Sequence, residues 1–489
     1  MRIACAALSA TLLSGCAGVF APAVPPAPVP PNWPADVAAI AGPSPPNSSG
    51  GDTADDAASA APSWRAFFAE PALQATIALA LANSRDARLA AARLLEARAQ
   101  AGLSGAALRP TLDATAQRNV QHQPDGLGNR DQGGTSQRYD VGLGANWELD
   151  FWGRLAALDA AARAAVLAST EAQRAVRLSL IGNVAAATYD YVDLLAREAL
   201  LGRVQANRAQ RRDLVRARRD VGLAGDIELH VAEVAVHSAQ ADALVARRNR
   251  ANGENLLRLL CGAEPDWAAL HAALGAIEPA PAGAGEASTI LPPLPEYPAL
   301  PVGLPSDVLL RRPDVAAAEQ RLTAAQANVD AARAAFFPRI SLTAGAGTAS
   351  DALSGLFAAG SNTWNFVPLL RLPLFDAGKR EAEHDLAKAR EIAAVADYEQ
   401  VVQTAFREVA DALAVSAWGG PATVAAHRAA QAQLARLPLV DARVAAGVAN
   451  RIEQLDAHHD ALLAHLAQRS ARRQIHLAAV NAWRVVGGL

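Results

Sequence analysis

The chain has 489 residues, of which 51% are hydrophobic and only 5% aromatic, a composition that favours long alanine-rich helices over compact cores built on aromatic residues. Its 45 basic and 48 acidic side chains leave a net charge of -3, so there is no global positive field to hold nucleic acid. The sequence contains no P-loop, G-x-S-x-G or C-x-x-C motif, and we do not expect an enzyme.

The N-terminus has the pattern of an export signal. Met1 and Arg2 precede a short apolar run that ends in Leu13-Ser14-Gly15-Cys16, a sequence typical of a bacterial lipobox. Residues 1–15 are therefore expected to be removed, and Cys16 to carry a covalent lipid anchor in the outer membrane. An ordinary cleaved signal that happens to contain a cysteine is the alternative.

A polar segment follows the lipobox. Residues 16–63 are rich in proline, alanine, glycine and serine, and they predict an extended tether between the lipid and the folded part. Because Cys5 leaves with the signal and Cys16 is lipidated, Cys261 remains alone and no intramolecular disulfide can form. We expect Cys261 to be a small buried residue rather than a reactive thiol.

The rest of the chain contains an internal duplication. Residues 86–116 align with residues 314–344 without a gap. The register then resumes at three pairs of glycines: Gly153 and Gly378, Gly222 and Gly447, and Gly262 and Gly487. Each copy predicts a helix, a β-hairpin and a long helical hairpin, and such a unit cannot bury its apolar faces without neighbours.

The duplication sets the expected organisation of the chain. The expected segments are the signal peptide 1–15, the tether 16–63, a first repeat 64–262 with a β-hairpin at 111–149 and a helical hairpin at 153–260, a linker 263–303, and a second repeat 304–489 with a β-hairpin at 339–375 and a helical hairpin at 378–486. The first helix is expected from about Pro71 to Leu108, ahead of Pro110.

Four segments have the alternating periodicity of strands. The clearest runs from Tyr139 to Leu149, and the others begin near Leu112, Ile340 and Trp364. Each has about ten residues, the length of a tilted strand that crosses a bilayer. Because lipid does not tolerate open sheet edges, four strands in a membrane require several subunits to assemble. Two soluble hairpins packed on a helical body are the alternative.

Long helical patterns follow each β-hairpin. They run from Gly153 to about Asp220 and from Gly378 to Ala445, and each has a shorter return helix. Within the second pattern lie Gly419-Gly420-Pro421 and Pro438, and we expect a break in the helix there.

Three stretches resemble the outer-membrane factor family, the TolC-like and NodT-type lipoprotein channels of tripartite efflux pumps. They are YDVGLGANWELDFWGR at 139–154, GLPSDVLLRRPD at 303–314 and PLFDAG at 373–378. The resemblance implies a mostly α fold with a membrane β part. In this fold the helical hairpins of a homotrimer form an α-barrel through the periplasm, continuous with a twelve-stranded β-barrel to which each protomer gives four strands.

The resemblance also implies a function, a passive exit duct for small molecules in the outer membrane. Its partners would be a periplasmic adaptor and an inner-membrane transporter of the RND type. A lipid-anchored periplasmic coiled-coil scaffold, or an outer-membrane duct for protein secretion, are the alternatives. The cargo is not readable, because a wide water-filled lumen has no pocket.

A closed periplasmic tip follows from the same resemblance. The family closes the tip with inward carboxylates just past the second turn, and these positions fall on Glu453 and Asp456, with Glu228 as a partner from the first hairpin. Such a ring attracts cations and repels anions. Ordinary surface acids beside a turn are the alternative.

The ties that latch the tip in the family differ in this chain. Val444 and Ala449 replace the family's tyrosine and arginine, and Arg451 is the candidate substitute. Adaptor docking is expected in grooves between adjacent tips. The residues expected there are Val221, Gly222, Leu223, Val444, Gly447 and Val448. They also make the turns, and the two roles are compatible.

One cluster has the composition of a metal site. Its members are Asp456, His458, His459, Asp460 and His465. Asp456 and His459 are three residues apart, as ligands on one helix can be, but no H-E-x-x-H pattern occurs. We expect no metal and no cofactor besides the lipid on Cys16.

Overall fold

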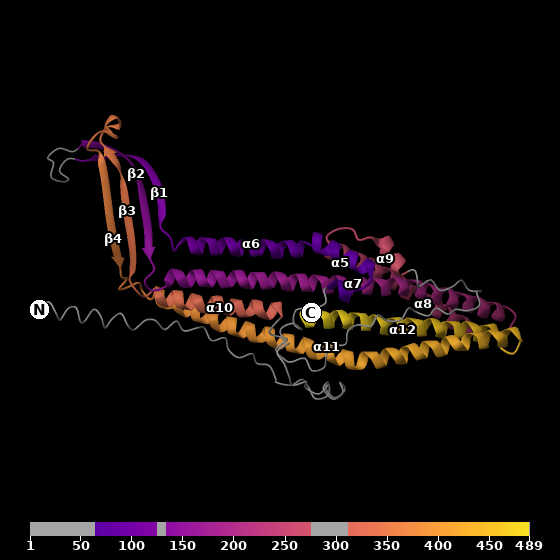
Figure 1. The fold of residues 1–489 in the computed structure, drawn as a ribbon. Helices are drawn as coiled ribbons and strands as arrows, with labels where there is room; N and C mark the ends of the chain where they lie inside the picture. Colours follow the sequence, from indigo (N-terminus) through magenta and orange to yellow (C-terminus); the bar gives the residue numbers. More distant parts are fainter. Residues whose placement is uncertain (1–63, 125–133, 275–311, 489) are drawn as a thin grey trace, which may run out of the picture. The chain divides into compact units, whose positions relative to one another are not determined.

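The computed structural model describes residues 64–124, 134–274 and 312–488 (Figure 1). The expected signal peptide, the lipid anchor at Cys16, the tether and most of the expected linker lie outside these residues. The described chain divides into two compact units. One contains Leu95–Ala168 and Ala317–Glu399, and the other contains the described parts of Pro28–Leu94, Ser169–Ala316 and Gln400–Leu489.

The first unit contains a four-stranded antiparallel sheet in the order β1-β2-β3-β4 (Figure 1). Its strands are β1 (Thr111–Gln123), β2 (Gly134–Leu149), β3 (Arg339–Ser350) and β4 (Asn362–Arg371). Pairing of β2 with β3 joins the hairpins of the two repeats into one sheet. Strands β1 and β4 are its edges, so each leaves one row of backbone groups unpaired in the protomer.

The strand register collects apolar side chains on one face of the sheet. Leu112 pairs with Ala145, Ala145 with Ala344, and Ala344 with Phe366, and directly paired residues share a face. The next set of paired residues, which begins with Asp113, lies on the opposite face. The apolar side chains are not covered within the protomer, because Leu112 is 70% exposed and Phe366 is 58% exposed.

Two tryptophans fasten the base of the sheet to the preceding helices. The indole N–H of Trp147 donates to the carbonyl of Leu108 at 3.1 Å, and that of Trp152 donates to the carbonyl of Pro338 at 2.8 Å. The ring of Trp152 also stacks on Phe337, with 4.8 Å between centroids. Each tryptophan therefore binds a specific backbone carbonyl.

The helices account for most of the described residues. They are α4 (Trp64–Phe67), α5 (Pro71–Asn83), α6 (Arg85–Ala106), α7 (Arg154–Asp220), α8 (Asp226–Cys261), α9 (Trp267–Leu274), α10 (Pro313–Ala334), α11 (Lys379–Ala445) and α12 (Arg451–Val485). Aspartate caps the long helices where they leave the sheet. The Asp150 carboxylate accepts from the backbone N–H of Ala156 at 2.7 Å, and Asp376 accepts from that of Arg380 at 3.2 Å.

Within the described residues no helix combines the length and the apolar character needed to cross a membrane.

The expected single helix from Pro71 to Leu108 is wrong, because Ser84 separates α5 from α6. Ser84 has extended backbone angles (φ -55°, ψ 135°) and is buried. Gly262, at the end of α8, has φ +63°, and a Cβ there would lie 2.5 Å from the carbonyl oxygen of Asn83. The helix is therefore interrupted where the backbone of a distant segment packs against it.

The expected break at the prolines of the second long helix is also wrong. Helix α11 is continuous from Lys379 to Ala445 with Pro421 and Pro438 inside it. Each proline costs about 3 kcal/mol in a helix interior, but it removes only one backbone hydrogen bond. Buried Thr423 lies within donor distance of the Gly419 carbonyl (3.0 Å) and of the Ala471 carbonyl on α12 (3.4 Å). We attribute the continuity of α11 to its packing on α12.

The main core of the second unit joins the ends of the chain. Phe68 and Ile77 are fully buried, and the ring of Phe68 packs edge-on against Trp483 near the end of α12, with 5.4 Å between centroids. Cys261 lies in the same core as a free thiol, and burial raises its pKa to about 11. The prediction of a small, buried cysteine is confirmed.

Arg312, part of the second family-like stretch, has a structural role in this unit. Its side chain is 8% exposed and forms ion pairs with Asp314 at 2.8 Å and with Glu408 of α11 at 2.7 Å. It also donates to the carbonyl of Val485 at 3.2 Å, where α12 ends. One guanidinium therefore connects the start of α10, the middle of α11 and the end of α12, and its removal would leave two carboxylates without their cation.

The glycines of the sheet give a testable prediction. A Cβ on Gly347 would lie 2.3 Å from the carbonyl oxygen of Val141 and 2.6 Å from the Cα of Gly142, whereas a Cβ on Gly144 would meet nothing within 4 Å. We expect Gly347→Ala to reduce the amount of folded protein in the outer membrane severalfold, because backbone atoms must move. Gly144→Ala is the matched control and should leave that amount unchanged. Equal amounts of both variants would contradict the prediction.

Candidate gate at the helical tips

The two helical hairpins turn with the same backbone geometry. Gly222 has φ +76° and Gly447 has φ +73°, values that favour glycine. The residue after each glycine donates its N–H to the carbonyl five residues earlier, Leu223 to Arg218 at 2.7 Å and Val448 to Arg443 at 2.9 Å. Both helices therefore end in the same glycine cap, as the aligned glycines of the two repeats indicated.

Apolar side chains at the turns are open to solvent in the protomer. Val221 is 69% exposed, Leu223 is 68% exposed and Val448 is 70% exposed. Val444, which was also expected at the tip, is only partly exposed. In a turn of this type, the residue after the glycine usually packs on the helix end, so exposed Leu223 and Val448 are available to a partner.

The start of α12 is capped by side chains. The Asn450 Oδ1 accepts the backbone N–H of Glu453 at 2.8 Å, and the Glu453 carboxylate accepts from Arg443 of α11 at 2.6 Å. Helix α8 begins at Asp226, and Gly225 before it has no side chain to cap the helix. Glu453, expected as a gate carboxylate, is therefore tied to its own hairpin in the protomer.

Asp456 connects α12 to the other hairpin. Its Oδ1 atom lies 3.0 Å from the Arg211 Nε and 3.5 Å from an Arg208 Nη on α7. Beside this ion pair, the Asn207 amide donates to the carbonyl of Leu455 at 3.0 Å. Asp456, the second expected gate carboxylate, is therefore the site of a tie between α7 and α12.

Glu228, the third expected carboxylate, lies in the first turn of α8 and is exposed. Among the described residues it has no hydrogen bond or ion pair. The three expected gate acids therefore have three different environments in the protomer. Arg451, the candidate latch, contacts Gln454 on its own helix.

Sequence reasoning did not connect the gate acids with the arginines that bind them, namely Arg208, Arg211 and Arg443. Arg208 and Arg211 belong to an arginine-rich stretch of α7 and are three residues apart, so they share a face of the helix. That spacing was visible in the sequence. Its partner was not, because Asp456 lies 245 residues away from Arg211.

The members of the possible metal cluster bind different neighbours. Asp460 pairs with Arg436 at 3.1 Å, His458 lies 3.4 Å from Asp441, and Asp456 faces α7 as described. In the part of the chain that the structure describes, no three His, Cys, Asp or Glu side chains are placed to hold a metal ion.

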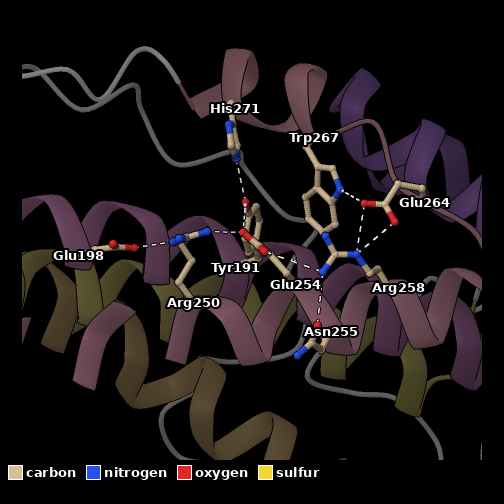
Figure 2. Close-up of polar contacts among 9 residues, drawn as sticks. All are labelled: Tyr191, Glu198, Arg250, Glu254, Asn255, Arg258, Glu264, Trp267 and His271. Carbon is tan, nitrogen blue, oxygen red and sulfur yellow. Dashed lines mark hydrogen bonds and ion pairs between the residues drawn. The ribbon is translucent and has the colours of Figure 1, made fainter. Parts of the chain in front are cut away.

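A polar network away from the turns fixes α9 to the first hairpin (Figure 2). The hydroxyl of Tyr191, a fully buried residue of α7, lies 2.7 Å from the His271 Nε2 of α9 and 3.4 Å from a Glu254 oxygen of α8. Arg250 donates to the same Glu254 and also to Glu198, with 2.5 Å between the Arg250 Nε and a Glu198 oxygen. Helix α9 lies in the segment expected as a linker.

Trp267 completes the attachment of α9. Its ring meets that of Tyr191 edge-on, with 5.2 Å between centroids, and the Arg258 guanidinium lies over the Trp267 ring, 5.1 Å from its centroid. The indole N–H donates to Glu264 at 2.5 Å, and Glu264 also accepts from Arg258 (Figure 2). Aromatic packing and hydrogen bonds together hold α7, α8 and α9 at this level, separate from the tips.

Known proteins share this organisation. The family model for outer membrane efflux proteins matches residues 76–263 and 304–488, one match in each repeat. The outer membrane protein OprJ of Pseudomonas aeruginosa is 37% identical over 426 residues, covering 87% of this chain and 86% of OprJ. The toluene efflux pump outer membrane protein TtgF of Pseudomonas putida is 35% identical over 476 residues, covering 97% of this chain and 94% of TtgF.

The fold agrees with these matches. A crystal structure of a membrane protein from Pseudomonas aeruginosa superposes with a TM-score of 0.77 at 34% identity, covering 95% of this chain and 99% of the other. The resemblance predicted from three short stretches is therefore confirmed over both repeats. The chain belongs to the outer membrane efflux protein family.

Proposed function

We propose that the protein is the outer-membrane exit channel of a tripartite efflux system, through which small molecules pass without energy input from the channel itself. One observation carries this proposal: the sheet has an uncovered apolar face and two unpaired edges in the protomer. In lipid, each unpaired backbone group costs several kcal/mol, so the edges of neighbouring copies must pair.

We infer a homotrimer, in which three four-stranded sheets close one barrel. The helices support assembly as well. On α8, Ile227 is 81% exposed, Val231 is 59% exposed and Val234 is 68% exposed, at the i, i+4 and i+7 spacing of one helix face. Such an uncovered stripe fits packing against a helix of a neighbouring copy.

The lipid on Cys16 remains part of the proposal as a second attachment to the outer membrane. Acyl chains contribute about 0.8 kcal/mol per buried methylene group, so several chains anchor a protein stably. The periplasmic scaffold is disfavoured, because a soluble protein would not leave the apolar face of the sheet uncovered. The family is one of efflux channels rather than enzymes.

Delivery of the cargo is assigned to partners. A periplasmic adaptor would dock on the tips, and an inner-membrane transporter, expected to be of the RND type, would supply the energy. The exposed apolar side chains after the two cap glycines, Leu223 and Val448, support docking there. A helix of the adaptor would cover these side chains in the grooves between adjacent tips.

The gate is assigned to the tip acids Glu453, Asp456 and Glu228. The tie from Asp456 to Arg208 and Arg211 holds the second hairpin against the first within one protomer, and this supports a closed resting state. Around a threefold axis, the acids would still give the constriction a negative potential that attracts cations.

The first prediction for this function concerns assembly. Protein purified in detergent should have the mass of three chains by native mass spectrometry, and it should conduct ions across a planar lipid bilayer. Delipidated protein that is monomeric and soluble without detergent would contradict the channel and favour the scaffold.

The second prediction concerns the gate. Asp456→Asn should raise the conductance of the resting channel severalfold, because α12 loses the carboxylate that binds Arg208 and Arg211 of α7. Asp213→Asn is the matched control, since Asp213 is a 60% exposed aspartate of α7 whose ion pair is with its neighbour Arg212. Unchanged resting conductance in an Asp456→Asn trimer would contradict the role of the tie.

The third prediction concerns the adaptor. Replacing Leu223 and Val448 together with aspartate should abolish pump-dependent resistance while leaving the trimer intact, because charges at the tips prevent apolar docking. Leu353→Asp changes a residue of similar exposure, 66%, in the loop after β3 and should be silent. Full resistance in the double variant would argue against docking at these turns.

A further inference from the structure

A line of polar contacts runs between α7 and α12, and we call it the α7–α12 seam. Its fixed points, besides the tie at Asp456, are two ion pairs between aspartates of α7 and arginines of α12. Asp190 accepts from the Arg473 Nε at 2.6 Å, and Asp193 lies 3.8 Å from the Arg469 Nε. Asp193 and Arg469 are almost fully buried, with 7% and 10% of their side chains exposed.

Three histidines of α12, His459, His465 and His476, lie along this seam. The His459 Nδ1 is buried and has no hydrogen-bond partner among the described residues. The ring of His476 stacks on that of Tyr189 of α7, with 4.4 Å between centroids, and the Tyr189 hydroxyl binds the Glu70 carboxylate at 3.1 Å. The imidazoles therefore belong to the interface between the two hairpins rather than to the surface.

Positive charge surrounds these imidazoles. His459 lies beside Arg208 and Arg211 of α7, with Asp456 and Asp460 on its own helix. The charged neighbours of His465 are Arg203 of α7 and Arg469 of α12, and those of His476 are Arg472 and Arg469. Along the whole seam, arginines outnumber aspartates. The arginines are Arg197, Arg203, Arg208, Arg211, Arg469, Arg472 and Arg473, and the aspartates are Asp190, Asp193, Asp456 and Asp460.

Both burial and the arginines oppose protonation of the histidines. Burial, followed by the nearby arginines, lowers the pKa of His459 and of His465 below the ordinary value for histidine. The same causes lower the pKa of His476 to about 4. At neutral pH, the three rings are uncharged and the seam is closed.

We propose that the α7–α12 seam is a helix–helix contact that opens at acidic pH. Protonation of His459, His465 and His476 in an acidified periplasm adds positive charge between the two helices and releases α12 from α7 along the seam. This goes beyond conduction of cargo, because it gives the protomer a response to pH that needs no partner. The released segment contains Leu455 and Asp456, which belong to the tie at the gate.

The direction of the effect follows from the linkage between protonation and opening. A depressed histidine pKa means that the closed seam binds fewer protons than the open one. The stabilisation is therefore complete above the ordinary pKa of about 6.5 and is lost as the pH falls toward 4. For His476 alone, the ratio of open to closed seam should rise on the order of 20-fold between pH 7 and pH 5. Asp193 acts in the opposite direction, because burial raises its pKa.

Hydrogen exchange measured by mass spectrometry on the full-length assembled protein tests the proposal. After correction for the intrinsic pH dependence of exchange, amides of α12 between Leu455 and His476 should exchange on the order of 20-fold faster at pH 5 than at pH 7. Amides of α10, which contains no histidine, serve as the internal reference and should not change. This measurement does not depend on conduction, so its outcome is separate from that of the proposed channel function.

Two variants separate the histidines from the other titrating groups. His476→Phe keeps an aromatic ring against Tyr189 but cannot be protonated, and it should remove most of the acceleration. His230→Phe changes a 74% exposed histidine of α8 and should keep all of it. The proposal is overturned if α12 in the native protein exchanges equally at both pH values, if α10 accelerates as much as α12, or if His476→Phe combined with His459→Gln and His465→Gln retains the acceleration.

Discussion

Lipid's intolerance of unpaired backbone groups is the constraint on which the rest of this structure depends. Strands β1 and β4 each have a free edge, and the protomer has no other strand among its described residues to cover either one. A free edge of a ten-residue strand leaves about five N–H and about five C=O groups unpaired, which in hydrocarbon would cost far more than a typical folding free energy of 5–15 kcal/mol. Assembly of copies is therefore a condition of the fold in the membrane and not an addition to it.

The seam between α7 and α12 differs in strength along its length. Near the end of α12, Val480 and Trp483 are buried with Ile181 and Val184 of α7 in one apolar core. Each such side chain contributes about 1.5–3 kcal/mol by its burial.

Toward the tips, the same pair of helices is held by ion pairs. The Asp456 side chain is 43% exposed, and pairs at that exposure contribute about 0–1 kcal/mol each. The two hairpins of a protomer can thus separate at the tip while the apolar end stays together. A gate needs this distribution of strength.

Much of the architecture was predictable, because periodicity and glycine positions are local properties. The alternation around Tyr139 and Leu149 fixed the faces of the sheet, and the aligned Gly222 and Gly447 fixed the turns. The gap at Ser84 was not predictable, because it depends on the close approach of Gly262, far along the chain.

The break wrongly expected in α11 and the unforeseen partners of Asp456 have the same cause. A local rule expects Pro421 to end a helix, but packing against α12 outweighs a cost of about 3 kcal/mol. Likewise, the sequence shows that Asp456 is an acid one turn from Glu453, yet only the tertiary structure shows that α7 supplies its counter-charges. Sequence reasoning identified candidate gate residues, and it could not identify what holds them.

The duplication also separates the tasks of the two hairpins. Both turns carry the same glycine cap, but only the second continues into a helix start with Asn450 as its cap and with Glu453 and Asp456 bound to arginines. In the first hairpin, the equivalent helix begins at Asp226 after Gly225, and Glu228 has no such partner among the described residues. The first hairpin is held instead by Arg219, which lies 3.0 Å from Asp226, and it presents the uncovered apolar stripe that begins at Ile227. If the copies assemble through that stripe, the polar tie at Asp456 is the contact left free to open when a partner engages the tip.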